Sequence, residues 1–155
     1  TPNHLRRPTQ APKHTLADPA LAARLLGMSR GRLLSGEGSA LTPHDGTFLG
    51  QLFESLATLS VRVFAGAVPA QVSHLRQQDG RHEVDLIVER EQDRKVGALE
   101  VKLSAAVEDE DVRHLLWLKE QLGDDLVDCA VLTTGSTAYR RPDGVGVIPL
   151  ALLGP

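Results

Sequence analysis

The spacing of apolar residues predicts two long helices. From Thr47 to Phe64 the apolar side chains recur every three or four residues, which is the period of an amphipathic helix. The segment from Glu108 to Leu122 has the same period, places four acids in its first turn, where the helix dipole favours them, and ends at Gly123. In the first helix one stripe is made by Phe48, Leu52, Leu56, Leu59 and Val63, and a second arc by Ala57, Val61 and Phe64, with Glu54 at its edge.

Alternating and continuous apolar runs predict the strands. Glu83 to Glu89 alternates, so Val84, Leu86 and Val88 face one way while Asp85 and Ile87 face the other. A polar turn over Glu91 to Arg94 joins this strand to Val96–Leu103 and predicts an antiparallel hairpin. Three further strands are expected: Pro69 to Leu75, a buried parallel one at Val127 to Thr133, and a short last one at Val145 to Pro149.

These elements predict an α/β fold in the order helix, three strands, helix, strand, strand. Before them, Thr1 to Lys13 carries three prolines and is expected to be an extended arm. Asp18 and Pro19 predict a short helix as its N-cap and first residue, ending at Gly27. Residues 35–46 have the composition of a loop. We therefore expect residues 1–46 to be an arm and short helix packed on a main domain of residues 47–155.

Composition narrows the class of protein. The chain is 41% hydrophobic, enough for a core, and no apolar run approaches the ~20 residues of a membrane span. Aromatic residues make up 3%, which argues against a stacking platform for single-stranded nucleic acid. The single cysteine, Cys129, lies in an apolar run and is expected in the core, which fits a reducing cytoplasm. The start at Thr1 rather than Met favours a piece of a longer protein.

Charge divides unevenly along the chain. Residues 1–35 carry six basic residues and one acid, which leaves the remainder with 11 of the 17 basic and 19 of the 20 acidic residues. The basic segment fits either a nucleic-acid or acidic partner or a solvated surface. The acidic remainder fits a site for a cation, because carboxylates are the preferred ligands of Mg²⁺.

The candidate chemistry is acidic. Glu100 and Lys102 are two residues apart on one predicted strand, so they share a face. The hairpin brings Asp85, an acid that interrupts an apolar strand, beside them. Two converging carboxylates favour a hard cation, Mg²⁺ or Mn²⁺, that activates water. Lys102 would then orient that water or stabilise negative charge, and Glu54 could supply a third carboxylate.

This pattern resembles the PD-(D/E)XK nuclease superfamily, or restriction-endonuclease-like fold, whose core is helix, three-stranded meander, helix and strand. Its signature residues correspond to Asp85, Glu100-Val101-Lys102 and, on the first helix, Glu54. The proline expected before the aspartate is Val84 here. The resemblance implies that Asp85, Glu100 and Lys102 are catalytic and that Glu54, Asp85 and Glu100 hold the metal.

A second resemblance covers nearly the whole chain. The segments GQLFESLATLSVRVFAG, RHEVDLIVE, GALEVK and VLTTG are similar to the C-terminal module, domain of unknown function 4143, of bacterial and archaeal AAA+-type ATPases. This implies an N-terminal ATPase domain as a partner. The chain itself has no phosphate-binding Gly-x-x-x-x-Gly-Lys-(Ser/Thr).

Two functions therefore stay open from the sequence. One is a Mg²⁺-dependent nuclease that hydrolyses phosphodiester bonds of nucleic acid. The other is a non-catalytic module that binds DNA or a protein for a linked ATPase. Two further positions are weaker candidates for phosphate contacts: His82, whose alternative is an ordinary surface histidine, and Arg140-Arg141, whose alternative is a solvated loop.

Overall fold

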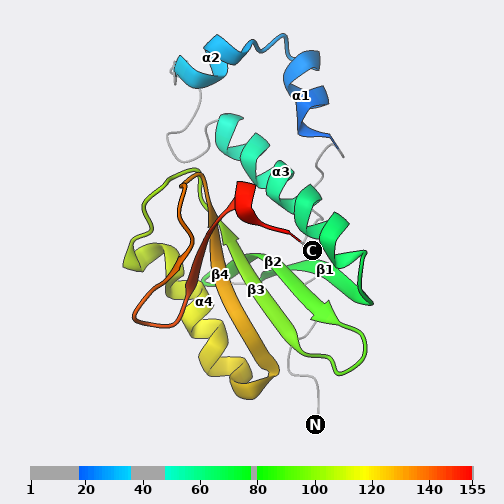
Figure 1. Cartoon of the computed structure of the whole chain (residues 1–155), viewed down its shortest axis with the longest axis vertical. Coiled ribbons are helices and arrows are strands. Elements are labelled where there is room, and N and C mark those ends of the chain that lie inside the picture. The colour runs from blue at the N-terminus through cyan, green and yellow to red at the C-terminus, as the bar shows by residue number, and fades with distance from the viewer. Residues whose placement is uncertain (1–17, 36–47, 78–79, 155) are drawn as a thin grey trace.

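A computed structural model describes residues 18–35, 48–77 and 80–154. Figure 1 shows a twisted sheet with a helix on each side and two short helices beyond one end of α3. The helices are α1 (Pro19–Leu25), α2 (Arg30–Ser35), α3 (Phe48–Ala65) and α4 (Asp109–Leu122), with 3₁₀ turns η1 (Gly123–Asp125) and η2 (Leu150–Leu152). The strands are β1 (Ala70–Arg76), β2 (Glu83–Arg90), β3 (Val96–Val101), β4 (Leu126–Thr133), β5 (Tyr139–Arg140) and β6 (Gly146–Pro149). The predicted mixed α/β fold is confirmed, with helix, three-stranded meander, helix and strand in that order.

The sheet has the strand order β1-β2-β3-β4-β6-β5. The first three strands form an antiparallel meander, and β2 and β3 make the expected hairpin. α4 carries the chain from the end of β3 back to the start of β4, so these two strands are parallel. β6 then pairs in parallel with β4, and β5 with β6 antiparallel.

Helices α3 and α4 cover opposite faces of the sheet. On β3, Ala98 lies in the core cluster that contains α4, whereas Leu99 packs against the cluster that contains α3. β4 alternates in the same way, with Val131 on the α4 face and Leu132 on the α3 face. Cys129 is buried in the α4-side cluster, as the sequence predicts. Both faces of the central strands are therefore cores.

The side of α3 that packs on the sheet is not the side that carries its stripe of large apolar residues. Ala57, Val61 and Ala65 are its buried residues. In the stripe of larger side chains none is buried, and Leu56 and Val63 are 43% and 62% exposed. Small residues allow a helix to approach a sheet closely, so the second arc, and not the stripe, packs on the strands.

Helix α1 begins as predicted. The Asp18 Oδ1 atom accepts a hydrogen bond from the Ala20 N–H group at 2.8 Å, and Pro19 occupies the first helical position. α1 contacts α3, but Leu25 and Leu26 are 71% and 63% exposed. Helix α2 and the two-residue strand β5 were not predicted. The arm at 1–13 and the loop at 36–46 lie outside the described residues. No helix among the described residues is long and apolar enough to cross a membrane.

Candidate functional site

Glu100 lies at the carboxyl end of β3, on the face covered by α4. It alternates with Val96 and Ala98, both buried, and is itself only 7% exposed. Its Oε1 atom is buried and has no hydrogen-bond partner among the described residues. The sequence placed Glu100 on a polar strand face. The structure instead buries this carboxyl at the rim of a core, because α4 crosses over that face.

Asp85 reaches β3 from a bulge in β2. β1 and β2 are in register at Ser73–Ile87 and again at Leu75–Val84, so one residue of β1 faces two of β2, Asp85 and Leu86. The bulge breaks the predicted alternation, because Val84 now packs on the α4 face while Leu86 packs on the α3 face. Bulges re-aim side chains. The Asp85 Oδ2 atom accepts a hydrogen bond from the Val101 N–H group at 2.9 Å.

The two carboxyls are electrostatically coupled. Burial, and after it the negative charge of Asp85, raises the pKa of Glu100 from its ordinary 4.5 to about 10. The Lys102 ammonium acts in the opposite direction but more weakly. A carboxyl with this pKa holds a proton at neutral pH unless another positive charge replaces it. The pair therefore needs one proton or one cation to offset the repulsion between its two carboxylates.

Lys102 is held by helix α4. Its Nζ atom lies 2.9 Å from the Asp111 Oδ1 atom. The other oxygen of Asp111 accepts a hydrogen bond from the Glu108 N–H group at 3.0 Å, which caps the helix. Burial alone would raise the pKa of Asp111, but the Glu108 N–H group and the Lys102 ammonium together hold it below its usual value. Asp111 therefore stays ionised and fixes the lysine to the start of α4.

Glu54 lies half-buried on α3, the helix on the other face of the sheet. The charged groups with the strongest effect on the pKa of Glu100 are Asp85, Lys102 and Glu83. Within the described residues, no three His, Cys, Asp or Glu side chains come together as a group that could hold a metal ion. The acidic pair is therefore Asp85 and Glu100, with Lys102 beside it.

A cluster of rings lies further along α4. His82 stacks on Trp117 with ring centroids 4.0 Å apart and planes 7° apart. The His82 and His114 Nδ1 atoms are 3.3 Å apart, and the Arg113 Nε atom donates to the His114 Nε2 atom at 3.0 Å. His114 follows Asp111, the partner of Lys102, by one turn of α4, so the ring cluster adjoins the acidic pair.

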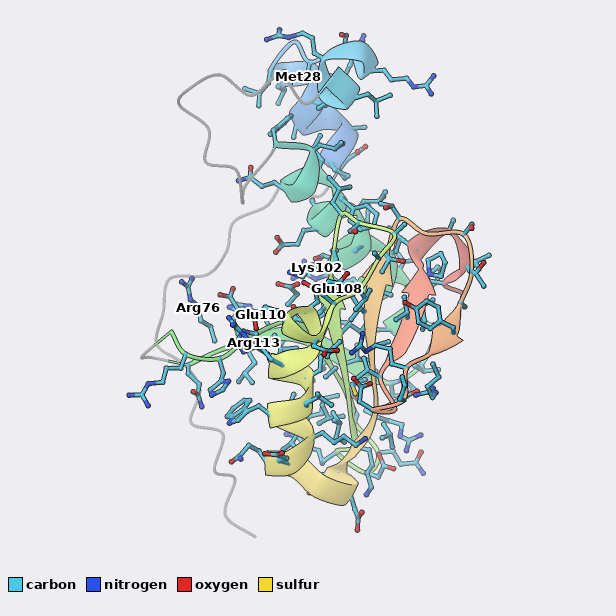
Figure 2. The ribbon with its side chains drawn as sticks, turned by 90° about the vertical axis from the view of Figure 1, so that its left-hand side faces the viewer. Met28, Arg76, Lys102, Glu108, Glu110 and Arg113 are labelled. Carbon is cyan, nitrogen blue, oxygen red and sulfur yellow. The ribbon has the colours of Figure 1, made fainter. Side chains whose placement is uncertain are left out.

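The charges around the site are mostly paired within the chain. Figure 2 shows Lys102, Glu108, Glu110 and Arg113 around the first turns of α4, with Arg76 nearby. Arg113 pairs with Glu110, and the Arg76 Nε atom lies 3.6 Å from the Glu83 Oε2 atom. An incoming anion would have to compete with these carboxylates for the cations.

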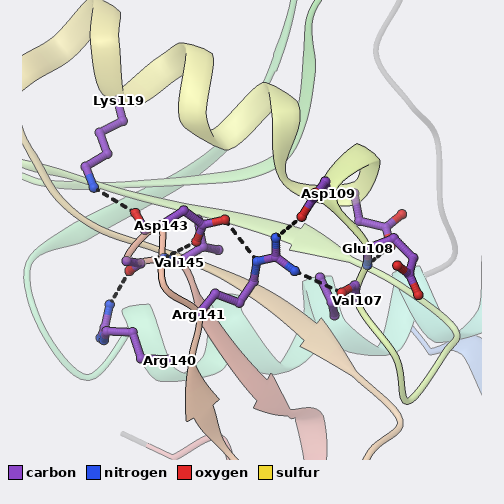
Figure 3. Close-up of polar contacts among 10 residues, drawn as sticks. Val107, Glu108, Asp109, Lys119, Arg140, Arg141, Asp143 and Val145 are labelled. Carbon is purple, nitrogen blue, oxygen red and sulfur yellow. Dashed lines mark hydrogen bonds and ion pairs between the residues drawn. The ribbon is translucent and has the colours of Figure 1, made fainter.

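Arg141 ties the C-terminal part of the sheet to the start of α4 (Figure 3). Its guanidinium pairs with Asp109 and Asp143 and donates to the Val107 carbonyl oxygen at 2.9 Å. Its neighbour Arg140 pairs with Asp128 at 2.8 Å. Both arginines thus hold structure together, but only Arg141 is largely buried, whereas the Arg140 side chain is 57% exposed. The sequence interpretation missed the pairs with Asp128 and Asp109 because these partners are 12 and 32 residues away.

Asp111 and His114 were also missed as parts of the site. The acids at the start of α4 were assigned to the helix dipole alone, although the Glu108-x-x-Asp111 spacing matches that of a helix cap whose third residue reaches back. His114 is one helical turn after Asp111 and so lies on the same side of α4. These two spacings are the sequence features that could have indicated Asp111 and His114.

Comparison with protein families assigns the chain. The model of the family described as Domain of unknown function (DUF4143) matches residues 49–153. The chain belongs to this family, and the match includes β2, β3 and α4, which carry the acidic pair and Lys102. Neither the curated proteins nor the solved structures yield a match.

Proposed function

We propose that Asp85 and Glu100 bind a divalent cation such as Mg²⁺ or Mn²⁺, and that the site hydrolyses phosphodiester bonds in nucleic acid. The observation that supports this most directly is the buried Glu100 Oε1 atom, which has no partner among the described residues while a second carboxyl faces it. A buried unsatisfied carboxyl oxygen is costly, and oxygen ligands are what Mg²⁺ prefers. The residues present therefore fit a hard cation.

Each residue of the chain has a distinct role in this proposal. A bound cation would supply Lewis acidity toward the phosphate and would lower the pKa of water. Asp85 is held in place by the Val101 N–H group, and Glu100 by the surrounding core. Lys102, fixed by Asp111, stabilises the negative charge that grows on the phosphate oxygens as water attacks phosphorus and the P–O bond breaks.

Glu54, the third carboxylate that the sequence suggested as a ligand, lies on α3, across the sheet from α4. It forms no metal-binding group with the pair among the described residues, so the proposed cation is held by Asp85 and Glu100. Substitution of Glu54 by Gln should weaken cation binding less than Asp85→Asn does. Equal losses of cation binding in the two variants would show that Glu54 contributes as much to the site as Asp85.

Cation binding and cleavage are tested separately. Calorimetry with Mn²⁺ on the wild type, Asp85→Asn and Glu100→Gln should show heat only in the wild type, and equal heats would end the proposal of a site. Single-stranded, double-stranded and branched DNA, and RNA, are then incubated with the wild type in Mn²⁺. Cleavage that persists in Asp85→Asn would identify a contaminating nuclease.

The second candidate is a non-catalytic module that binds DNA or a protein for an ATPase domain. The observation that favours it is the pairing of the nearby cations with carboxylates, as in Arg113–Glu110 and Lys102–Asp111, because a nuclease needs positive charge for the phosphate backbone. This second function predicts that the protein binds DNA or the ATPase domain without cleaving nucleic acid. Asp85→Asn should then leave the binding unchanged.

A further inference from the structure

The ring cluster has a defined hydrogen-bond direction. The Arg113 guanidinium can only donate, so the His114 Nε2 atom, which it contacts at 3.0 Å, accepts. A ring nitrogen that accepts carries no hydrogen, so the His114 ring is neutral, in line with the burial that keeps its pKa below the usual value. A neutral imidazole carries one hydrogen. In His114 that hydrogen is therefore on Nδ1.

This assignment fixes the tautomer of His82. The His114 Nδ1–H group faces the His82 Nδ1 atom at 3.3 Å, so the latter accepts and carries no hydrogen. The hydrogen of a neutral His82 is then on Nε2. Within the described residues, this Nε2 atom has no hydrogen-bond partner. Stacking on Trp117 and the bond from His114 hold the ring on two sides. The His82 Nε2–H group is therefore a donor held in a fixed position, with no acceptor among the described residues.

We propose that His82 binds a phosphate of a nucleic-acid strand through its Nε2–H group, beside the phosphate that a cation at Asp85 and Glu100 would hold. This rests on the proposed function for the substrate class. Lys102 pairs with Asp111 at 2.9 Å, and His114 follows Asp111 by one turn of α4, so the two places are neighbours. His82 precedes Asp85 by three positions, which is about 10 Å along extended backbone. Two phosphates of one nucleic-acid strand can therefore occupy the two places.

The chain contains its own probe for this contact. Trp117 is the single tryptophan, and it stacks on His82. Its fluorescence should change when octathymidylate binds in Ca²⁺ or in EDTA, and the titration gives the affinity. Thymidylyl-thymidine, whose single phosphate cannot occupy both places, is the matched ligand.

Two variants separate the hydrogen bond from the ring stack. His82→Phe keeps a flat ring on Trp117 but has no donor, and it should weaken octathymidylate binding about three- to tenfold, the size of one hydrogen bond. His82→Gln restores a donor and should recover part of the affinity. At pH 8 the salt dependence should stay unchanged in His82→Phe, since a neutral donor releases no counterion, while Lys102→Ala should lower the slope by about one.

The outcomes distinguish failure of the His82 contact from failure of the proposed cation site. Four results would each overturn the His82 contact. The first is wild-type affinity in His82→Phe, and the second is an equal loss of affinity in the Phe and Gln variants. The others are an equal loss of affinity for the dinucleotide and the octamer, and no binding of octathymidylate by the wild type. Binding in EDTA that depends on His82, together with no Mn²⁺ heat, would support His82 and reject the cation site.

Discussion

On the α3 face, β3 presents Leu99 and Val101 to an apolar core made with Ala57, Val61 and Leu132. On the α4 face the same strand presents Ala98 to a larger apolar core and then, one step later, Glu100. The buried residues of both helices are apolar, but α4 also carries the half-buried Asp111 and His114, which contact Lys102 and His82. The comparison shows that a polar site can be built at the rim of a core when one helix supplies both the apolar cover and the polar partners.

The largest effect is expected at Lys102, on the polar side of this comparison. If the domain cleaves nucleic acid, Lys102→Ala should lower the rate a hundred- to thousandfold, equivalent to about 3–4 kcal/mol of barrier. The side chain is 43% exposed, so the unfolding free energy should change little. Single-turnover cleavage and thermal unfolding measure the two quantities. An equal loss in stability would make the lysine structural.

Leu115 tests the apolar side of the comparison. It lies on α4 and is fully buried against the sheet, whereas Leu56 on α3 is 43% exposed. Leu115→Ala should destabilise the fold by about 3 kcal/mol through lost burial and a cavity. Leu56→Ala, the matched control, should change the unfolding free energy by no more than about 1 kcal/mol. Chemical denaturation of both variants decides this, and a large effect at Leu56 would show that the exposed stripe of α3 is covered.

Glu100 tests how much the buried carboxyl destabilises the cation-free protein. Its pKa in the fold is about 10, above the ordinary 4.5, so the folded state binds the extra proton. Its stabilising contribution is complete below pH 4.5 and declines as the pH rises toward 10. At pH 7 the unfavourable difference reaches about 3 kcal/mol. Glu100→Gln, which resembles the protonated carboxyl, should therefore be more stable than the wild type.

The pH dependence makes this test specific. In a chelator, the advantage of Glu100→Gln should vanish near pH 4 and grow steadily up to pH 9. Mg²⁺ should stabilise the wild type and leave the variant unchanged. A constant difference between the two proteins at all pH values would mean that packing, and not the proton, separates them.

Asp111 gives the smallest effect. In Asp111→Asn the amide oxygen still accepts from the Glu108 N–H group, so the cap of α4 survives while the ion pair with Lys102 is lost. The unfolding free energy should fall by less than about 1 kcal/mol, and cleavage should fall about tenfold because Lys102 is no longer held. Glu120→Gln, on an exposed position near the other end of α4, removes the same charge without touching Lys102 and should leave cleavage unchanged. Equal rates in the two variants would contradict the role of Asp111.

The sequence predicted the order of elements and the hairpin because these depend on short-range periods. The acid at Glu100 and its neighbour Asp85 were predicted to share a face, and the pKa of Glu100 responds to Asp85. What the sequence did not contain is the long-range information. Alternation cannot reveal a bulge that turns Val84 to the α4 face. Spacing along one segment cannot reveal that α4 would cover Glu100, or that Arg141 would pair with Asp109.

The clamp made by Arg141 sets the shortest chain that can keep this site. Every proposed ligand and the lysine precede residue 103, and Asp111, which holds the lysine, lies early in α4. Yet the loop and first turn that position Asp111 are fastened by a guanidinium that the chain reaches only after β5. A protein cut back to end after β4 would retain all of these side chains and lose their alignment. The region to preserve in any shortened or permuted version therefore extends well past the last residue with a chemical role.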